Sequence, residues 1–170
     1  MDEERFSEII DEYQQPIRSV IQKMVNSWDT AHDLCQDTFL KFWDYRNQVD
    51  LDKPIFTLLY KIAINIAIDF LRKKKPEISN IDPEILLSEN DSINFKEVYQ
   101  LILNCSEKLQ TKQKAIFILR DIEGFTFEEI KLIMNMPVSN IRSNLHLARK
   151  NIKKYMETFF QINQEIIYEL

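Results

Sequence analysis

The chain has 170 residues, of which 45% are hydrophobic and 29% charged, with one glycine, five prolines and two cysteines. A typical chain of this length has about a dozen glycines, so the composition excludes Gly-rich phosphate loops and most turn-rich β architectures. The formal net charge is −5, and overall electrostatics therefore give no reason to expect nucleic-acid binding. The composition indicates a mostly helical protein.

The amino terminus and the cysteines argue against export. Residues 1–10 (MDEERFSEII) are acidic where a signal peptide is basic and then apolar. Cys35 and Cys105 can form at most one disulfide, too few for a secreted disulfide framework. No apolar run approaches the length of about 18 residues that a membrane span needs. The sequence predicts a cytoplasmic protein.

Acidic charge is concentrated in the middle of the chain. Residues 76–105 contain one basic and six acidic residues, and their first part, PEISNIDPEILLSENDS, holds two prolines. Such a stretch between two helical patterns is typical of a linker. The sequence therefore predicts an all-α protein of two small helical domains, residues 1–75 and 95–170, joined by a flexible acidic linker at 76–94.

The first domain shows three amphipathic patterns. Apolar residues recur every three or four positions over 6–24, which predicts a helix with a kink at Pro16. Asp29 is a suitable N-cap for a second helix, whose apolar stripe consists of Ala31, Leu34, Cys35, Thr38, Phe39 and Phe42. A third helix is predicted at 55–75, where its basic end is favoured by the helix dipole.

The second domain contains the signals of a helix-turn-helix. One helix is predicted over residues 95–109, and residues 115–119 lie in another that stops at Gly124. Gly124 suits the left-handed position after a helix, and Thr126 with Glu129 forms a capping-box pattern that opens a short helix ending at Met134. Asn135 is suited to the turn, and a longer helix follows over 137–155.

The last helix is amphipathic, with one apolar and one basic face. Ile141, Leu145, Ala148 and Ile152 fall on the face expected to pack against the short helix. Residues 131–156 contain six bases and no acid. Lys and Arg neutralise DNA phosphates, and Arg can read guanine in the major groove. A solvated basic helix face is the alternative interpretation.

Three segments together resemble one known family. LQTKQKAIFILRDIEGFTFEEIKLIMNMPVSNIRSNLHLARKNI is similar to the promoter-binding helix-turn-helix of bacterial sigma factors. AHDLCQDTFLKFW and FTLLYKIAINIAIDFLRKKK resemble the other domain of that family. The two-domain form is identified as that of an extracytoplasmic-function (ECF) sigma factor, and the resemblance covers residues 6–75 and 109–155.

The resemblance implies a protein that binds core RNA polymerase, directs it to promoters and promotes DNA opening, without catalysing a reaction itself. The implied partners are the β′ clamp helices and β flap of the polymerase, promoter DNA and an anti-sigma factor. The family implies no cofactor, metal or small-molecule substrate, and a monomer when free.

The resemblance also implies roles for individual residues, with residues 47–53 matching the loop that captures an unstacked base. Contacts to the upstream promoter element are expected from Ser139, Asn140, Arg142, Ser143, Asn144, His146, Arg149 and Lys150. Contacts to the downstream element are expected from Asn47, Lys53, Lys61, Asn65, Asp69, Arg72 and Lys73. The surface for the β′ clamp helices is expected to contain Asp33, Gln36, Asp37, Phe39, Leu40 and Trp43.

The chain departs from the family pattern at several positions. Leu58 stands where Trp is common, and Gln110 replaces a usual Pro. Asn144 and Leu147 replace usual arginines. Because Leu147 falls on the DNA side of its helix, one phosphate contact is expected to be lost. Asn135 replaces a turn Gly, without physical consequence.

Other functions predict different behaviour. A stand-alone dimeric helix-turn-helix regulator would bind a symmetric operator. A protein-binding helical adaptor would be insensitive on DNA to Arg142→Glu. His32 and Cys35 lie three residues apart on a helix, but a closed zinc site would need ligands from both domains. The segment after Met156 has the pattern of a short amphipathic helix, which either serves regulation or merely extends the last helix.

Overall fold

The computed structural model describes residues 1–49, 54–73 and 95–168, and side chains up to residue 161. Within these ranges the chain forms seven α-helices and one π-helical turn, with no strand. The N-terminal block consists of α1 (Glu3–Val25), α2 (Trp28–Asp44) and α3 (Ile55–Lys73). The C-terminal block consists of α4 (Phe95–Ser106), α5 (Thr111–Phe117), the π-helical η1 (Ile118–Ile122), α6 (Phe127–Met134) and α7 (Val138–Tyr168). The expected linker at 76–94 lies outside the described residues. None of the described helices is long and apolar enough to cross a membrane.

Local capping sets the boundaries of α1 and α2. The Asp2 side chain accepts a hydrogen bond from the Arg5 amide, and α1 continues through Pro16. Asn26 ends α1 in the left-handed conformation. Ser27 then caps α2 by accepting from the Thr30 amide. The expectation of Asp29 as the N-cap is wrong by two residues, because the extended Ser27 already supplies the acceptor oxygen.

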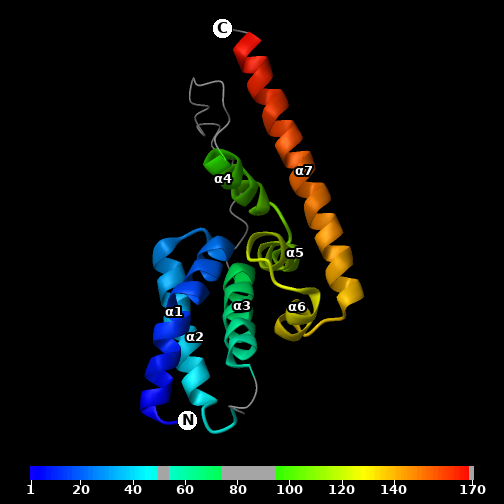
Figure 1. Ribbon diagram of the computed structural model, residues 1–170. Helices are drawn as coiled ribbons and strands as arrows, with labels where there is room; N and C mark the ends of the chain where they lie inside the picture. Colours follow the sequence, from blue (N-terminus) through cyan, green and yellow to red (C-terminus); the bar gives the residue numbers. More distant parts are fainter. Residues whose placement is uncertain (50–53, 74–94, 169–170) are drawn as a thin grey trace.

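Helix α3 lies at the centre of the molecule, with α1 and α2 on one side and α5 and α6 on the other (Figure 1). It is buried around much of its circumference, at Leu59, Tyr60, Ile62, Ala63, Ile64, Ala67 and Ile68. A helix with apolar residues on most faces needs more than one packing partner. The two predicted domains therefore meet in this structure, with α3 shared between them.

The C-terminal block is built around α5, α6 and the first part of α7. Gly124 has φ of +78° and ends the segment after η1, as the sequence predicts. Helix α7 runs without interruption to Tyr168, so the segment after Met156 extends the last helix and is not a separate element. In Figure 1 this extension runs past α4 to the carboxyl end of the chain.

Burial of the Tyr60 phenol gives a testable dependence of stability on pH. Desolvation raises the pKa of Tyr60 to about 12, from an ordinary value of 10.0. In the unfolded chain the phenol ionises near pH 10, so its contribution is fully present below pH 10 and is lost as pH rises through 12. By pH 12 this contribution to the free energy of unfolding has fallen by about 2 kcal/mol.

We expect Tyr60→Phe to remove this part of the alkaline destabilisation, because phenylalanine keeps the ring but has no ionisable group. Denaturant unfolding at pH 9 to 12, with wild type and variant compared at each pH, measures the difference. If the free energies of unfolding of the two proteins fall equally between pH 9 and pH 12, this expectation is contradicted.

Candidate DNA-binding and partner-binding surfaces

The helix-turn-helix predicted from the sequence is present in α6 and α7. The Thr126 hydroxyl accepts from the Glu129 amide at 3.2 Å, and the Glu129 carboxylate accepts from the Thr126 amide at 2.7 Å. This reciprocal capping box fixes the start of α6. Asn135, with φ of 49°, makes the turn before α7. The predicted apolar face of α7, Ile141, Leu145, Ala148 and Ile152, is buried.

The outer face of α7 is polar and open to solvent. Of the expected upstream-element residues, Ser139, Asn140, Arg142, Ser143, His146 and Lys150 are exposed here and Asn144 is half-buried, and the apolar Leu147 is exposed among them. The Ser143 hydroxyl and the Asn144 amide donate back to carbonyls of their own helix. The structure thus gathers seven of the eight expected upstream-element residues on one surface, which we call the α7 face.

Arg142 is positioned on the α7 face by an aromatic ring. Its guanidinium carbon lies 4.9 Å from the centre of the Phe127 ring, and that of Arg120 lies 4.7 Å from the same centre. Stacking a guanidinium on an aromatic ring restricts its orientation while its N–H groups stay free to donate. The Arg142 head is therefore held at the surface, oriented for a planar acceptor.

Arg149 has a different environment from the rest of this set. Its guanidinium makes two hydrogen bonds to the Asp121 carboxylate, at 2.8 and 2.6 Å. The hydrogen bond to Asp121 raises the pKa of Arg149. Because the charge is already paired with a carboxylate from η1, Arg149 can contact a phosphate only by exchanging partners. Sequence spacing gave no indication of this ion pair.

A second surface lies where α2 ends and α3 begins. A cleft of about 350 Å³ is lined by Lys41, Tyr45, Gln48, Val49, Leu58, Lys61, Ile62 and Asn65. Two of the predicted downstream-element residues, Lys61 and Asn65, are among its walls, and Leu58 lines it where the family commonly has Trp. We call this the α2–α3 cleft.

The other expected downstream-element residues that the structure describes are not among the residues lining the cleft. Asn47 and Lys73 are exposed, and Lys53 lies outside the described residues. Asp69 and Arg72 form an exposed ion pair with 4.0 Å between their charged atoms. The sequence reasoning missed Tyr45, an aromatic residue at the C-cap of α2 that is 42% exposed. The signal that could have identified Tyr45 was an aromatic residue just before the predicted base-capturing loop at 47–53.

The third surface is the exposed side of α2. Asp33, Gln36, Asp37 and Leu40 are all exposed, and Leu40 is 64% exposed despite being apolar. We call these four residues the α2 patch. The Gln36 amide nitrogen lies 3.1 Å from His32 Nε2. An exposed leucine among carboxylates and an amide suits contact with another protein.

Two aromatic residues expected on this surface, Phe39 and Trp43, are instead buried or half-buried. Phe39 is 6% exposed and belongs to the hydrophobic core, so its expected place on the polymerase-binding surface is corrected. Trp43 is half-buried, and the centre of its ring lies 4.6 Å from the centre of the Phe6 ring and 4.5 Å from the guanidinium carbon of Arg46. The helical period of α2 places Phe39 toward the core rather than beside Leu40.

Cys35, the second member of the candidate metal pair, is buried. Its thiol donates to the Gln14 carbonyl at 3.6 Å, and burial raises its pKa. Among the residues that the structure describes, there is no cluster of three or more His, Cys, Asp or Glu side chains able to hold a metal ion.

Comparison with known proteins identifies both blocks. The family description "Sigma-70 region 2" matches residues 9–77, and "Sigma-70, region 4" matches residues 99–152. The chain is 26% identical over 170 residues to the ECF RNA polymerase sigma factor SigW of Bacillus subtilis, covering 91% of this chain and 90% of that protein. It is 28% identical over 166 residues to the ECF RNA polymerase sigma-E factor of Escherichia coli K12, covering 89% and 86%.

Solved structures show the same fold. The sigma factor RpoE, in complex with the anti-sigma factor NepR from Bartonella quintana, matches with a TM-score of 0.67 and 21% identity over 90% of this chain and 97% of that one. CnrH, in complex with the cytosolic domain of CnrY, matches with a TM-score of 0.69 and 17% identity over 92% and 90%. The chain belongs to the sigma-70 family. Within that family, its two matched regions and its relatives identify it as an ECF sigma factor.

Proposed function

We propose that this ECF sigma factor, which directs RNA polymerase to promoters, does so through the three surfaces described above. The α2 patch would bind core polymerase, the α2–α3 cleft would hold the melted downstream element, and the α7 face would read the upstream element. The observation that supports this assignment most directly is the gathering of seven predicted upstream-element residues on one face of a helix-turn-helix recognition helix. In such motifs this helix enters the major groove.

The α2–α3 cleft is suited to an unstacked base. Tyr45 offers an exposed ring for stacking, Asn65 offers hydrogen-bonding groups, and Lys61 offers a positive charge beside the backbone of the strand. Aromatic rings and cations are the groups with which proteins hold single-stranded DNA. A base extracted from the duplex loses stacking worth a few kcal/mol, and a preformed cleft offsets that cost.

The polymerase would perform all the chemistry, and the sigma factor would act with it in the cytoplasm. The sigma factor RpoE was solved in complex with the anti-sigma factor NepR, which supports a proposal that an anti-sigma factor also regulates this chain. We further propose that the C-terminal block contacts the β flap of the polymerase.

The departure at Leu147 gives a prediction about salt dependence. Leu147 is 45% exposed on α7, where a cation would reach a phosphate. Each phosphate contact adds about 0.9 to the slope of log affinity against log salt concentration. We therefore expect Leu147→Arg to steepen the slope of upstream-element binding by about that amount, while Leu147→Ala leaves it unchanged. Fluorescence anisotropy titrations at several salt concentrations measure the slopes, and equal slopes for both variants would count against this placement.

Reconstituted transcription tests the proposed function as a whole. Core polymerase with and without the purified chain is incubated with fragmented genomic DNA, and transcript 5′ ends are mapped. We expect start sites that depend on the chain and share two asymmetric upstream sequence elements. Absence of such starts, together with dimeric protein bound to a symmetric operator, would support the regulator alternative instead.

A further inference from the structure

The two blocks are joined by an ion pair between residues distant in sequence. The Lys23 ammonium near the end of α1 lies 2.6 Å from the Glu123 carboxylate, which follows η1. Lys23 also donates to the Ser19 hydroxyl at 2.8 Å. Both charged side chains are about one-fifth exposed, at 21% and 20%. Partial burial reduces the screening of their attraction by water, so the pair contributes to holding the blocks together. Each charged group can be hydrated if the blocks separate.

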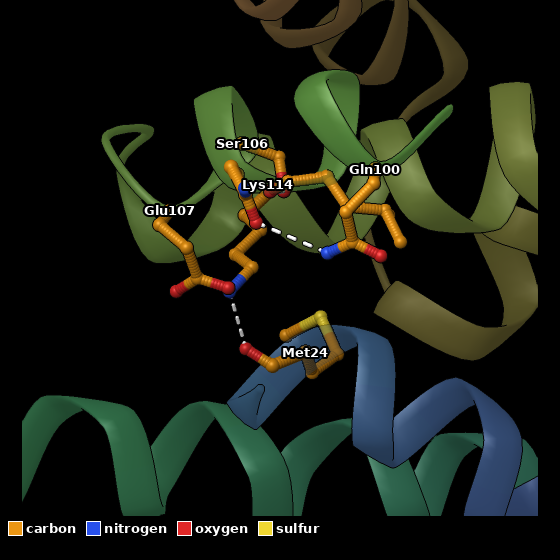
Figure 2. Close-up of polar contacts among 7 residues, drawn as sticks. Met24, Gln100, Ser106, Glu107 and Lys114 are labelled. Atoms are coloured by element: carbon orange, nitrogen blue, oxygen red, sulfur yellow. Dashed lines mark hydrogen bonds and ion pairs between the residues drawn. The ribbon is translucent and has the colours of Figure 1, made fainter. Parts of the chain in front are cut away.

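A buried lysine makes a second polar contact across the same boundary. The Lys114 side chain is 3% exposed, and its ammonium donates to the Met24 carbonyl of α1 and pairs with Glu107 at 2.7 Å (Figure 2). Desolvation lowers the pKa of Lys114, while Glu107 opposes the shift. A buried ammonium needs partners, and here one partner belongs to each block. Separation would return the ammonium to water without leaving an unpaired charge in the core.

An aromatic contact completes the boundary. The Phe125 ring lies 4.9 Å from the Tyr60 ring and 6.2 Å from the Phe56 ring, both on α3. Phe125 immediately precedes Thr126, the N-cap of α6. The start of the first helix of the helix-turn-helix is therefore fixed to the N-terminal block. Interfaces of this mixed polar and apolar kind are typical of domains that separate reversibly.

We infer that these contacts form a latch that holds the sigma factor in a closed, autoinhibited form. The latch consists of the Lys23–Glu123 ion pair, the Lys114–Met24 hydrogen bond and the Phe125 contact with α3. The inference rests on the proposed function, which requires the α2–α3 cleft and the α7 face to contact separate stretches of one promoter.

The closed form conflicts with that requirement in two ways. In a bound helix-turn-helix the first helix crosses the DNA backbone, whereas here α6 lies against α3 (Figure 1). The latch also fixes the separation of the two DNA-binding surfaces. The 21 residues between α3 and α4 can span up to about 70 Å when extended, so the covalent connection permits a much wider separation.

The latch has a quantitative consequence for binding. If only the open form binds, the apparent dissociation constant equals the intrinsic one divided by the open fraction. If only one molecule in ten is open, the apparent affinity is thus about tenfold weaker than that of the open form. Breaking the latch should recover part of that factor.

Charge reversal at the partly buried Lys23–Glu123 ion pair tests the latch without changing any residue of the hydrophobic core. Lys23→Glu and Glu123→Lys each place like charges together, and the double variant restores an opposite pair with the charges exchanged. Neither residue belongs to the three proposed binding surfaces. Small-angle X-ray scattering reports the radius of gyration, and anisotropy reports binding of each protein to core polymerase with promoter DNA. Circular dichroism checks that all variants remain helical.

We expect each single variant to have a larger radius of gyration and to bind about three- to tenfold more tightly than wild type, and the double variant to return toward wild type in both. An unchanged radius in the single variants would overturn the latch. A larger radius without tighter binding would overturn its inhibitory role. Failure of all four proteins to bind polymerase would overturn the proposed function and that role, while the radii still report separately whether the latch exists.

Discussion

Arg142→Glu is expected to lower promoter binding by the polymerase holoenzyme about 30- to 150-fold, equivalent to about 2–3 kcal/mol. Arg142 is exposed on the α7 face, and its guanidinium is oriented by the Phe127 ring. Replacement by glutamate removes both the phosphate or guanine contact and the positive charge, and adds repulsion from DNA. Anisotropy with a labelled promoter fragment and reconstituted holoenzyme measures the change.

Two further variants separate the causes of that loss. Arg142→Lys keeps the charge but not the planar pair of donors, so we expect an intermediate loss. Lys154→Glu makes the same charge change on α7 beyond the proposed face, at an exposed position, and should have little effect. If Arg142→Glu and Lys154→Glu weaken binding equally, the α7 face reads no specific element. If neither matters, the adaptor alternative gains support.

Tyr45→Ala is expected to reduce the open promoter fraction by about 5- to 150-fold, because base–aromatic stacking contributes about 1–3 kcal/mol. Tyr45 is an exposed wall of the α2–α3 cleft. At the helix end its backbone amide donates to carbonyls of α2 and its carbonyl accepts from the Gln48 amide, and alanine retains both groups. Fluorescence of a 2-aminopurine placed in the downstream element reports unstacking directly.

Tyr45→Phe is the matched control, since it keeps the ring and removes only the hydroxyl. We expect it to open promoters nearly as well as wild type. Binding of the closed duplex should be similar for all three proteins, because the cleft would act after melting. Equal opening by Tyr45→Ala and wild type would show that the cleft does not hold a base.

Features set by neighbouring residues could be predicted from the sequence. The capping box of Thr126 and Glu129, the left-handed Asn135 and the buried face of α7 all depend on spacings of a few residues, and all are present. Phe39 was misplaced because the resemblance put it on a surface, although the helical stripe of α2 had indicated core packing.

Features that join distant segments could not be predicted in the same way. The Arg149–Asp121 pair spans 28 positions and the Lys23–Glu123 pair spans 100. No periodicity relates such residues, and only the folded chain brings them together. The packing of the two blocks was signalled only indirectly, by the apolar character of α3 on most of its faces. The residues of the α2–α3 cleft likewise come from two helices and the segment between them.

Direct binding to core RNA polymerase is the measurement that tests the central claim. Labelled wild-type protein is titrated with purified core enzyme beside Gln36→Ala/Leu40→Ala, which truncates two exposed residues of the α2 patch, and Glu12→Ala/Gln15→Ala, which truncates two exposed residues of α1. We predict a dissociation constant of about nanomolar order for wild type and the α1 variant, and binding at least about tenfold weaker for the α2 variant. Absence of wild-type binding, with a dimer in solution, would contradict the assignment as a sigma factor.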